Sequence, residues 1–177
     1  MTRYVALLRS VNLGPNRVKM ADLREAFEAA GFKDPQTIVQ TGNVIFESAE
    51  PATALEAELE AMLHERFGYG TKVFVRSAAH MAALVAANPY PEMARDDPAH
   101  LVAMVMRQAP TPEQLAALRA AIVGRETAEA IGADVYLRYP DNIGDSKLTS
   151  GLIERRLGAS GTARNWNTVL KVVAALA

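Results

Sequence analysis

A segment near the C-terminus holds the densest group of polar side chains that could do chemistry. Residues 161–168 combine Arg164, Asn165 and Asn167 with the single tryptophan, Trp166, directly before the apolar run 169–177. Under a functional interpretation, main-chain amides at a helix start beside an arginine bind an anion, most naturally phosphate. Under a structural interpretation, Asn165 or Asn167 caps the helix, Trp166 anchors it and the Arg164 stem packs there. Both can hold, because one cap leaves other amides unsatisfied.

A second polar group follows the first apolar run of the chain, which ends at Arg9. Asn12, Arg17 and Lys19 lie in a glycine-containing loop between an expected strand and an expected helix, where phosphate-binding loops occur. The loop has neither the GxxxxGK[ST] nor the GxGxxG spacing. It is therefore either a basic anion-binding loop or an ordinary solvated turn.

Two shorter motifs complete the candidates. Asn43 follows Gly42 in a predicted tight turn between two strands, where these residue types are explained by turn chemistry alone. Ser146 and Lys147 are adjacent, so on a helix they do not face together and a Ser-Lys dyad is disfavoured. Ser146 is predicted to be a helix N-cap, while Lys147 could reach a phosphate.

The sequence gives little support for metal binding or for acid-base catalysis. Asp97 with His100, and the separate His64 and His80, lack a metal-ligand spacing such as HExxH. No pair of carboxylates stands out for proton transfer. We therefore expect no metal and no cofactor.

The charged residues are distributed unevenly along the chain, which the small net charge conceals. The chain carries −1 overall, yet residues 1–19 and residues 155–177 each hold four basic side chains and no acid. The two ends thus sum to +8, and the residues between them to −9. If the ends meet in space, they create a local basic field.

Length and composition bound the class of protein. With 177 residues, half of them apolar, the chain suits one domain or two small halves sharing a core. The absence of cysteine removes disulfides and thiolate chemistry and fits a reducing compartment. No apolar run approaches the ~18 residues of a membrane span. We expect a cytoplasmic protein without a membrane partner; the oligomeric state is not indicated.

The elements that must position the candidates follow from periodicity. In the first half we predict a strand at 4–8, a helix over 23–30, a hairpin of strands 37–40 and 44–47, a helix over 53–67 opened by a capping box at Thr53, a strand at 72–75 and a helix to 87. This is the β-α-β-β-α-β order of a ferredoxin-like unit, followed by a helix.

The second half repeats most of this order. Residues 89–98 contain three prolines and are predicted to hold neither helix nor strand. A strand at 101–106, a helix capped by Thr111, a hairpin over 127–139, a helix over 148–157 and the terminal helix follow. The prediction is an α+β protein of two ferredoxin-like α/β halves in β-α-β-β-α order, packed together, with the C-terminal helix docked on the core. The expected domains are 1–88, a connector 89–98, and 99–177; no residue-level repeat is visible.

Four stretches also match the pattern of a known family. They are residues 4–14 with 18–20, residues 40–46, residues 146–149 with 153–154, and residues 162–169. In them the chain resembles the bacterial proteins filed as domain of unknown function number 1697, colinearly over nearly its whole length. Ser10 and Ala163 depart from the common pattern by small changes. The resemblance implies an α+β protein of two similar halves and supplies no reaction, substrate or cofactor.

These observations favour a binding protein for a phosphate-bearing ligand, a nucleotide or nucleic acid, at a cleft built from the basic N- and C-terminal motifs. The alternatives are an enzyme acting on a small anionic metabolite, for which no nucleophile or base is visible, and an interaction protein whose motifs only pack the halves. The candidate ligand-binding residues are Arg9, Asn12, Lys19, Asn43, Lys147, Arg164, Asn165 and Asn167.

Overall fold

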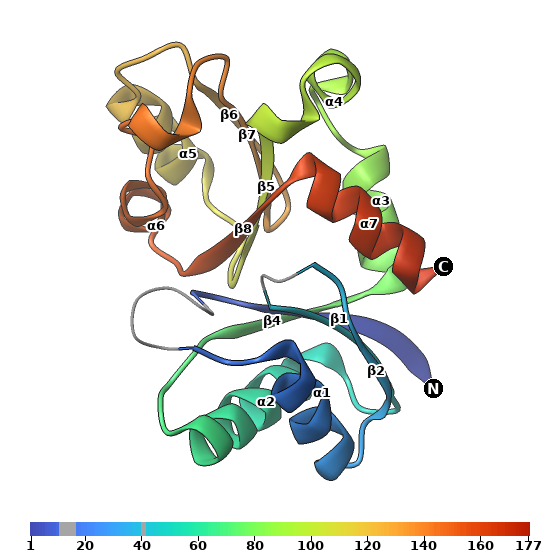
Figure 1. The fold of residues 1–177 in the computed structure, drawn as a ribbon. Coiled ribbons are helices and arrows are strands. Elements are labelled where there is room, and N and C mark those ends of the chain that lie inside the picture. The colour runs from blue at the N-terminus through green and yellow to red at the C-terminus, as the bar shows by residue number, and fades with distance from the viewer. Residues whose placement is uncertain (11–16, 40–41) are drawn as a thin grey trace. The chain divides into compact units, whose positions relative to one another are not determined.

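Continuous apolar runs form the central strand of each of two antiparallel sheets in the computed structural model (Figure 1). The structure describes residues 1–10, 17–39 and 42–177. Every residue from Tyr4 to Leu8, and every residue from Leu101 to Met106, is buried. Burial on both sides is what uninterrupted apolar strands require, so each run lies between two neighbouring strands.

The first sheet has the strand order β2-β3-β1-β4. Helices α1 and α2 cover one face of it, with Phe27, Leu55 and Leu59 fully buried in a core with the inward side chains of the strands (Figure 1). The elements are β1 (Thr2–Leu8), α1 (Met20–Ala29), β2 (Lys33–Thr37), β3 (Asn43–Ser48), α2 (Ala52–Phe67), β4 (Val73–Ser77) and α3 (Ala78–Ala86).

The second sheet has the corresponding order β6-β7-β5-β8. Helices α5 and α6 supply Leu118, Ile153 and Leu157 to its core. The elements are α4 (Pro91–Asp96), the 3-10 helix η1 (Pro98–His100), β5 (Leu101–Met106), α5 (Pro112–Ala121), β6 (Thr127–Ile131), β7 (Asp134–Arg138), the 3-10 helix η2 (Ile143–Asp145), α6 (Ser150–Leu157), β8 (Gly161–Asn165) and α7 (Trp166–Leu176).

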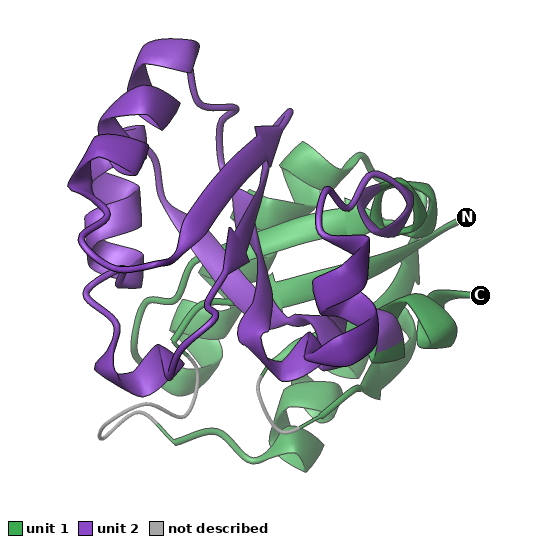
Figure 2. Ribbon diagram, turned by 90° about the horizontal axis from the view of Figure 1, so that it is seen from above, with its two compact units in different colours: residues 1–83, 171–177 green, residues 84–170 purple. Residues whose placement is uncertain are grey.

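The chain divides into two compact units, coloured separately in Figure 2. The first comprises residues 1–83 with 171–177, and the second comprises residues 84–170. Each unit carries one sheet and the helices that cover it. The predicted α+β fold of two halves in β-α-β-β-α order is confirmed.

The two units also correspond at individual strand positions, which the sequence did not reveal. Leu7 lies opposite Asn43 in the first sheet, and Val105 lies opposite Asp134 in the second. Val5 lies opposite Arg76, and Ala103 opposite Arg164. The β5 residues in these pairs follow the β1 residues by the same offset along the chain. The residues opposite them therefore correspond as well, Asn43 to Asp134 and Arg76 to Arg164.

The repeat extends to hydrogen bonds. The Arg76 guanidinium donates to the carbonyl of Val75 at 2.8 Å, as the Arg164 guanidinium does to the carbonyl of Ala163 at 2.8 Å. One residue later, the Ser77 hydroxyl accepts from the backbone N–H of His80, at the start of α3, as the Asn165 side chain does at the start of α7. The two units thus share polar features as well as topology.

Several predictions of local structure were wrong. The proline-rich stretch 89–98 contains α4, because Pro91 occupies the first turn of that helix, where its missing N–H is not needed. The first hairpin strand is Lys33–Thr37 rather than 37–40, since Val39 has a φ of +59°, outside the extended region. Strand β8 was missed altogether; it lies directly before α7.

Two predicted helix caps were also wrong. Helix α2 begins at Ala52 without a side-chain cap, so Thr53 opens no capping box. Helix α6 is capped by Thr149, whose hydroxyl accepts from the N–H of Leu152 at 3.3 Å, and not by Ser146. The capping box of Thr111 and Gln114 in α5 is confirmed.

Candidate functional site

The N-terminal candidates gather at one end of the first sheet. The backbone N–H of Leu8 donates to the carbonyl of Gly42 at 2.8 Å, and that of Arg9 donates to the carbonyl of Lys72 at 2.9 Å. The end of β1 therefore lies beside the starts of β3 and β4. Helix α1 runs back along the sheet, so Lys19, the residue before α1, lies at the same end. We call this region, with Arg9, Arg17, Lys19 and Lys72, the basic end.

The charges of the basic end are exposed. Arg17, Lys19 and Lys72 are all exposed, while Arg9 is half-buried. None of the described residues forms an ion pair with Arg17, Lys19 or Lys72. Helix α1 also begins without a side-chain cap. Sequence reasoning missed Lys72, which belongs to no motif; its only signal is that it precedes a strand starting at this end.

Asn43 is part of a turn. It is fully buried, and its amide donates to the carbonyl of Ile38 at 2.9 Å, while the Ile38 N–H donates to the carbonyl of Asn43 at 2.9 Å. Gly42 before it has a φ of +74°. These contacts support the interpretation of Gly42-Asn43 as turn chemistry. Asn12, and the Gln40-Thr41 part of this motif, lie outside the described residues.

Arg164 lies on β8 and is held against its own strand. Its guanidinium donates to the Thr162 hydroxyl and to the carbonyl of Ala163, each at 2.8 Å. Burial lowers the pKa of Arg164 to about 10, so the side chain remains charged at neutral pH. These contacts are those of a structural arginine whose stem and head both pack.

Asn165, and not Asn167, caps α7. The Asn165 side-chain oxygen accepts from the N–H of Thr168 at 3.0 Å, while Asn167 is exposed within the first turn. Trp166 is 3% exposed, and its ring centroid lies 6.4 Å from that of Tyr136. The structural interpretation of residues 161–168 is therefore supported in the roles of Asn165 and Trp166.

Lys147 is exposed in the loop between β7 and α6. Its neighbour Ser146 donates its hydroxyl to Glu126 and accepts from the N–H of Leu148. Ser146 is thus engaged with a carboxylate, which removes the remaining support for a Ser-Lys dyad. The register of the second sheet puts this loop, the end of β8 and the start of α7 at the same end of that sheet.

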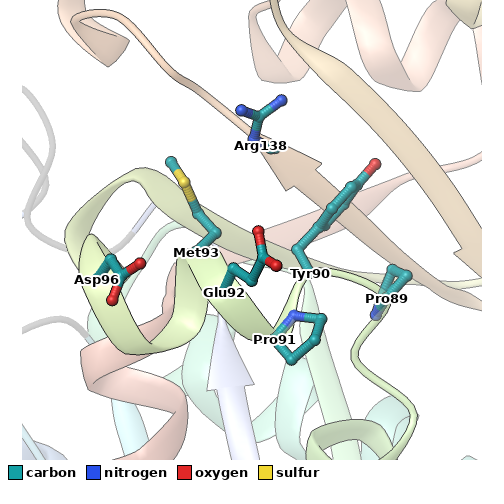
Figure 3. Close-up of a pocket in the computed structure, with 7 residues that line it drawn as sticks. All are labelled: Pro89, Tyr90, Pro91, Glu92, Met93, Asp96 and Arg138. Carbon is teal, nitrogen blue, oxygen red and sulfur yellow. The ribbon is translucent and has the colours of Figure 1, made fainter.

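A pocket opens at that end of the second unit (Figure 3). It has a volume of about 580 Å³ and lies between α4 and the last residue of β7, Arg138. Its lining residues are Pro89, Tyr90, Pro91, Glu92, Met93, Asp96 and Arg138. Sequence reasoning missed it, because residues 89–98 were interpreted as a connector.

An aspartate-histidine pair follows α4. The Nδ1 atom of His100 lies 2.7 Å from a carboxylate oxygen of Asp97, and both side chains are partly exposed. The sequence interpretation considered these residues only as metal ligands. In the part of the chain that the structure describes, no group of three or more such side chains is placed to hold a metal ion.

The candidates therefore form two groups within separate units. Arg9, Lys19 and Asn43 share one end of the first sheet. Lys147, Asn165 and Asn167 share one end of the second sheet, where Arg164 lies next to Asn165. Among the described helices, none combines the length and apolar character needed to cross a membrane.

The fold defines a class of protein: an α+β chain of two units, each with a four-stranded antiparallel sheet and the same element order. Within that class the chain belongs to the family described as "Protein of unknown function (DUF1697)", whose model matches residues 1–136. The family resemblance inferred from the sequence motifs is thereby confirmed.

A solved structure has the same fold. The conserved bacterial protein SP0830 from Streptococcus pneumoniae is similar with a TM-score of 0.77 and 21% sequence identity, over 99% of each chain. At this identity the similarity supports the fold alone. A comparison with curated proteins found no match.

Proposed function

We propose that this protein binds a phosphate-bearing ligand, a nucleotide or nucleic acid, through the basic end of the first sheet. The carrying observation is the set of exposed cations at that end: no described residue pairs with Arg17, Lys19 or Lys72. Exposed cations close together attract a multiply charged anion and raise its rate of association. The uncapped start of α1 adds amides of the same polarity.

The C-terminal candidates enter this proposal less directly. Arg164 and Asn165 already make hydrogen bonds within their own unit, and Lys147 and Asn167 are exposed. A direct role of these residues, and of Asn12 and Asn43, in holding the ligand stays a prediction from the sequence. A cytoplasmic location likewise stays a prediction from the sequence.

We further propose that each unit is ferredoxin-like, because both units have the element order and the strand order of such a unit.

The test is a binding titration of the full chain. Fluorescence anisotropy with a short labelled RNA, a short labelled DNA and a labelled mononucleotide is measured at low and high salt. We expect binding at low salt that weakens as salt rises, with a slope of log K against log salt that falls by roughly 2 to 3 in the triple variant Arg17→Gln, Lys19→Gln, Lys72→Gln.

A matched control separates local from overall charge. The triple variant Lys33→Gln, Arg155→Gln, Arg156→Gln removes the same charge from exposed positions outside the basic end, and we expect its binding to resemble that of the parent protein. Equal weakening in both triple variants, binding without salt dependence, or no binding at low salt would each contradict the proposal.

The second candidate, an enzyme acting on a small anionic metabolite, is favoured by one observation. Asp97 orients the His100 imidazole through its 2.7 Å contact with Nδ1, so that Nε2 is the nitrogen that would act as a base. The discriminating result is saturable turnover in a screen of phosphorylated and carboxylated metabolites that disappears in His100→Gln. Absence of turnover in the parent protein leaves the binding function preferred.

A further inference from the structure

The pocket of the second unit is lined by a cation, Arg138, and a carboxylate, Glu92, that do not form an ion pair with each other. Arg138 enters from the end of β7, and Glu92 extends toward that strand from α4 (Figure 3). No hydrogen bond or ion pair joins the Arg138 side chain to any residue that the structure describes. Asp96, one turn after Glu92 on α4, is engaged by Arg95. The cation and the carboxylate therefore lie across open space.

The remaining lining residues are apolar or aromatic. Met93 extends from α4 toward Arg138, and the Tyr90 ring stands beside Glu92 (Figure 3). Pro89 and Pro91 lie on either side of the base of Tyr90. A tyrosine, a methionine and two prolines form a surface that packs well against an apolar or aromatic group.

The Tyr90 ring reaches toward β6. Its hydroxyl is buried, and burial raises the pKa of Tyr90, with Thr127 as a close hydroxyl neighbour that acts in the opposite direction. Thr127 lies opposite Arg138 in the register of β6 and β7, so ring and guanidinium belong to the same face of the sheet. The aromatic surface and the cation thus lie on the same face of the second sheet.

We propose that this pocket binds a zwitterionic peptide-like molecule, a short peptide with free termini and an apolar side chain. Its carboxylate pairs with Arg138, its ammonium group pairs with Glu92, and its side chain packs on Tyr90 and Met93. The volume of about 580 Å³ exceeds what a single amino acid fills and is within the usual range for small-ligand sites. An arginine is well suited to a carboxylate because its planar donors match the two oxygens.

This site is independent of the basic end. It uses only second-unit residues, and its chemistry requires both signs of charge, whereas the basic end requires a polyanion. The two proposals can therefore fail separately: the triple variant Arg17→Gln, Lys19→Gln, Lys72→Gln retains peptide binding if the pocket is the peptide site.

The experiment uses the full chain and the dipeptide leucyl-phenylalanine. Binding is measured by calorimetry and by amide chemical-shift changes in NMR spectra, alongside the N-acetylated dipeptide, the C-terminal amide and inorganic phosphate. We expect binding of the free dipeptide with shifts confined to α4 and the end of β7. Blocking either terminus should weaken it by about tenfold, the scale of one charge-assisted hydrogen bond.

Variants separate the two charges. Arg138→Gln and Glu92→Gln should each weaken binding by about tenfold, while Arg156→Gln and Glu58→Gln, exposed outside the pocket, should leave it unchanged. Glu92 is exposed on a short helix, so its variant tests the site even if Arg138→Gln is less stable. Equal binding of the blocked dipeptides, shifts elsewhere in the protein, or no binding at millimolar dipeptide overturns the proposal.

Discussion

Two asparagines separated by one residue have different roles at the start of α7. The Asn165 side chain accepts from the N–H of Thr168, whereas Asn167 is exposed within the first turn. A helix cap satisfies an amide that has no partner within the helix. The sequence alone left both asparagines as possible caps, because each precedes the apolar run by a suitable distance.

We predict that Asn165→Ala lowers the free energy of unfolding by about 1 kcal/mol, the usual effect of losing a cap. Asn165→Asp, which keeps the acceptor, should retain most of the stability. Urea unfolding followed by circular dichroism gives both values. Asn167→Ala is the matched control and should change the stability by less than about 0.5 kcal/mol. A larger loss in Asn167→Ala than in Asn165→Ala would show that the cap is assigned to the wrong residue.

The site residues show how far individual side chains can be predicted. Arg9 and Lys19 were recognised because they flank a glycine-containing loop between an expected strand and an expected helix. Lys72 was missed because it stands alone in sequence and joins the basic end only through the pairing of β1 with β4. Tyr90 and Arg138 are far apart in the chain, and only the folded second unit brings them to one pocket.

At the scale of elements, α2 covers the outer edge of β4 with two carboxylates. Glu60 accepts from the N–H of Val73 at 2.9 Å, and Glu56 accepts from the N–H of Val75 at 3.0 Å. Strand β4 is an edge strand, so these N–H groups have no neighbouring strand to receive them. Glu56 and Glu60 are four residues apart on the helix, a spacing at which like charges repel each other mildly. The N–H donors of β4 offset this repulsion.

We predict that Glu56→Ala destabilises the protein by about 2 to 4 kcal/mol, because it leaves a buried N–H and the largely buried Arg76 without the carboxylate. Glu58→Ala, on the exposed face of the same helix, should be within about 0.5 kcal/mol of the parent protein. Urea unfolding midpoints compare the two. If the variants are equally stable, the carboxylate contacts contribute nothing measurable.

Elements were predicted where apolar periodicity is strong and missed where it is weak. The apolar runs of β1 and β5 and the stripes of α2 and α5 are visible in the sequence. Strand β8 reads Gly-Thr-Ala-Arg-Asn and β2 reads Lys-Asp-Pro-Gln-Thr, and neither alternates clearly. Both lie at sheet edges, so each owes its extended form to pairing with one neighbour, which the sequence does not display.

The stability of the whole molecule at high pH is set partly by two tyrosines of the second unit. Burial raises the pKa of Tyr136 and of Tyr139 to about 12, and each hydroxyl donates to a backbone carbonyl, of Leu84 and of Leu148. An unfolded tyrosine ionises near pH 10. The protonated forms therefore stabilise the fold fully below pH ~10, and that stabilisation is lost as the pH rises toward 12.

We predict that the free energy of unfolding falls above pH ~10 by about 1.4 kcal/mol per pH unit for each of these tyrosines. Unfolding in urea at a series of alkaline pH values measures the slope. In Tyr136→Phe the slope should decrease by the contribution of one tyrosine, while Tyr69→Phe, at a less buried ring, should reduce it much less. An unchanged slope in Tyr136→Phe would show that ionisation of Tyr136 does not contribute to the loss of stability at high pH.

The duplicated architecture was predicted from element order alone, and the structure extends it to matching residues. The correspondence was invisible in sequence because it involves pairs of different type, such as Asn43 with Asp134 and Ser77 with Asn165. Ser77 and Asn165 both accept an N–H at a helix start, although the accepting group differs. Topology constrains where an acceptor or donor must lie, and several residue types meet that requirement.

Trp166, buried at the start of α7, is an intrinsic fluorescent probe of the protein. Trp166 is the sole tryptophan, and the Tyr136 ring centroid lies 6.4 Å from its own. At that separation light absorbed by Tyr136 is passed to Trp166, so the excitation spectrum of the indole emission records whether the two rings remain together. Unlabelled protein can thus report a rearrangement at this place during any of the titrations described above.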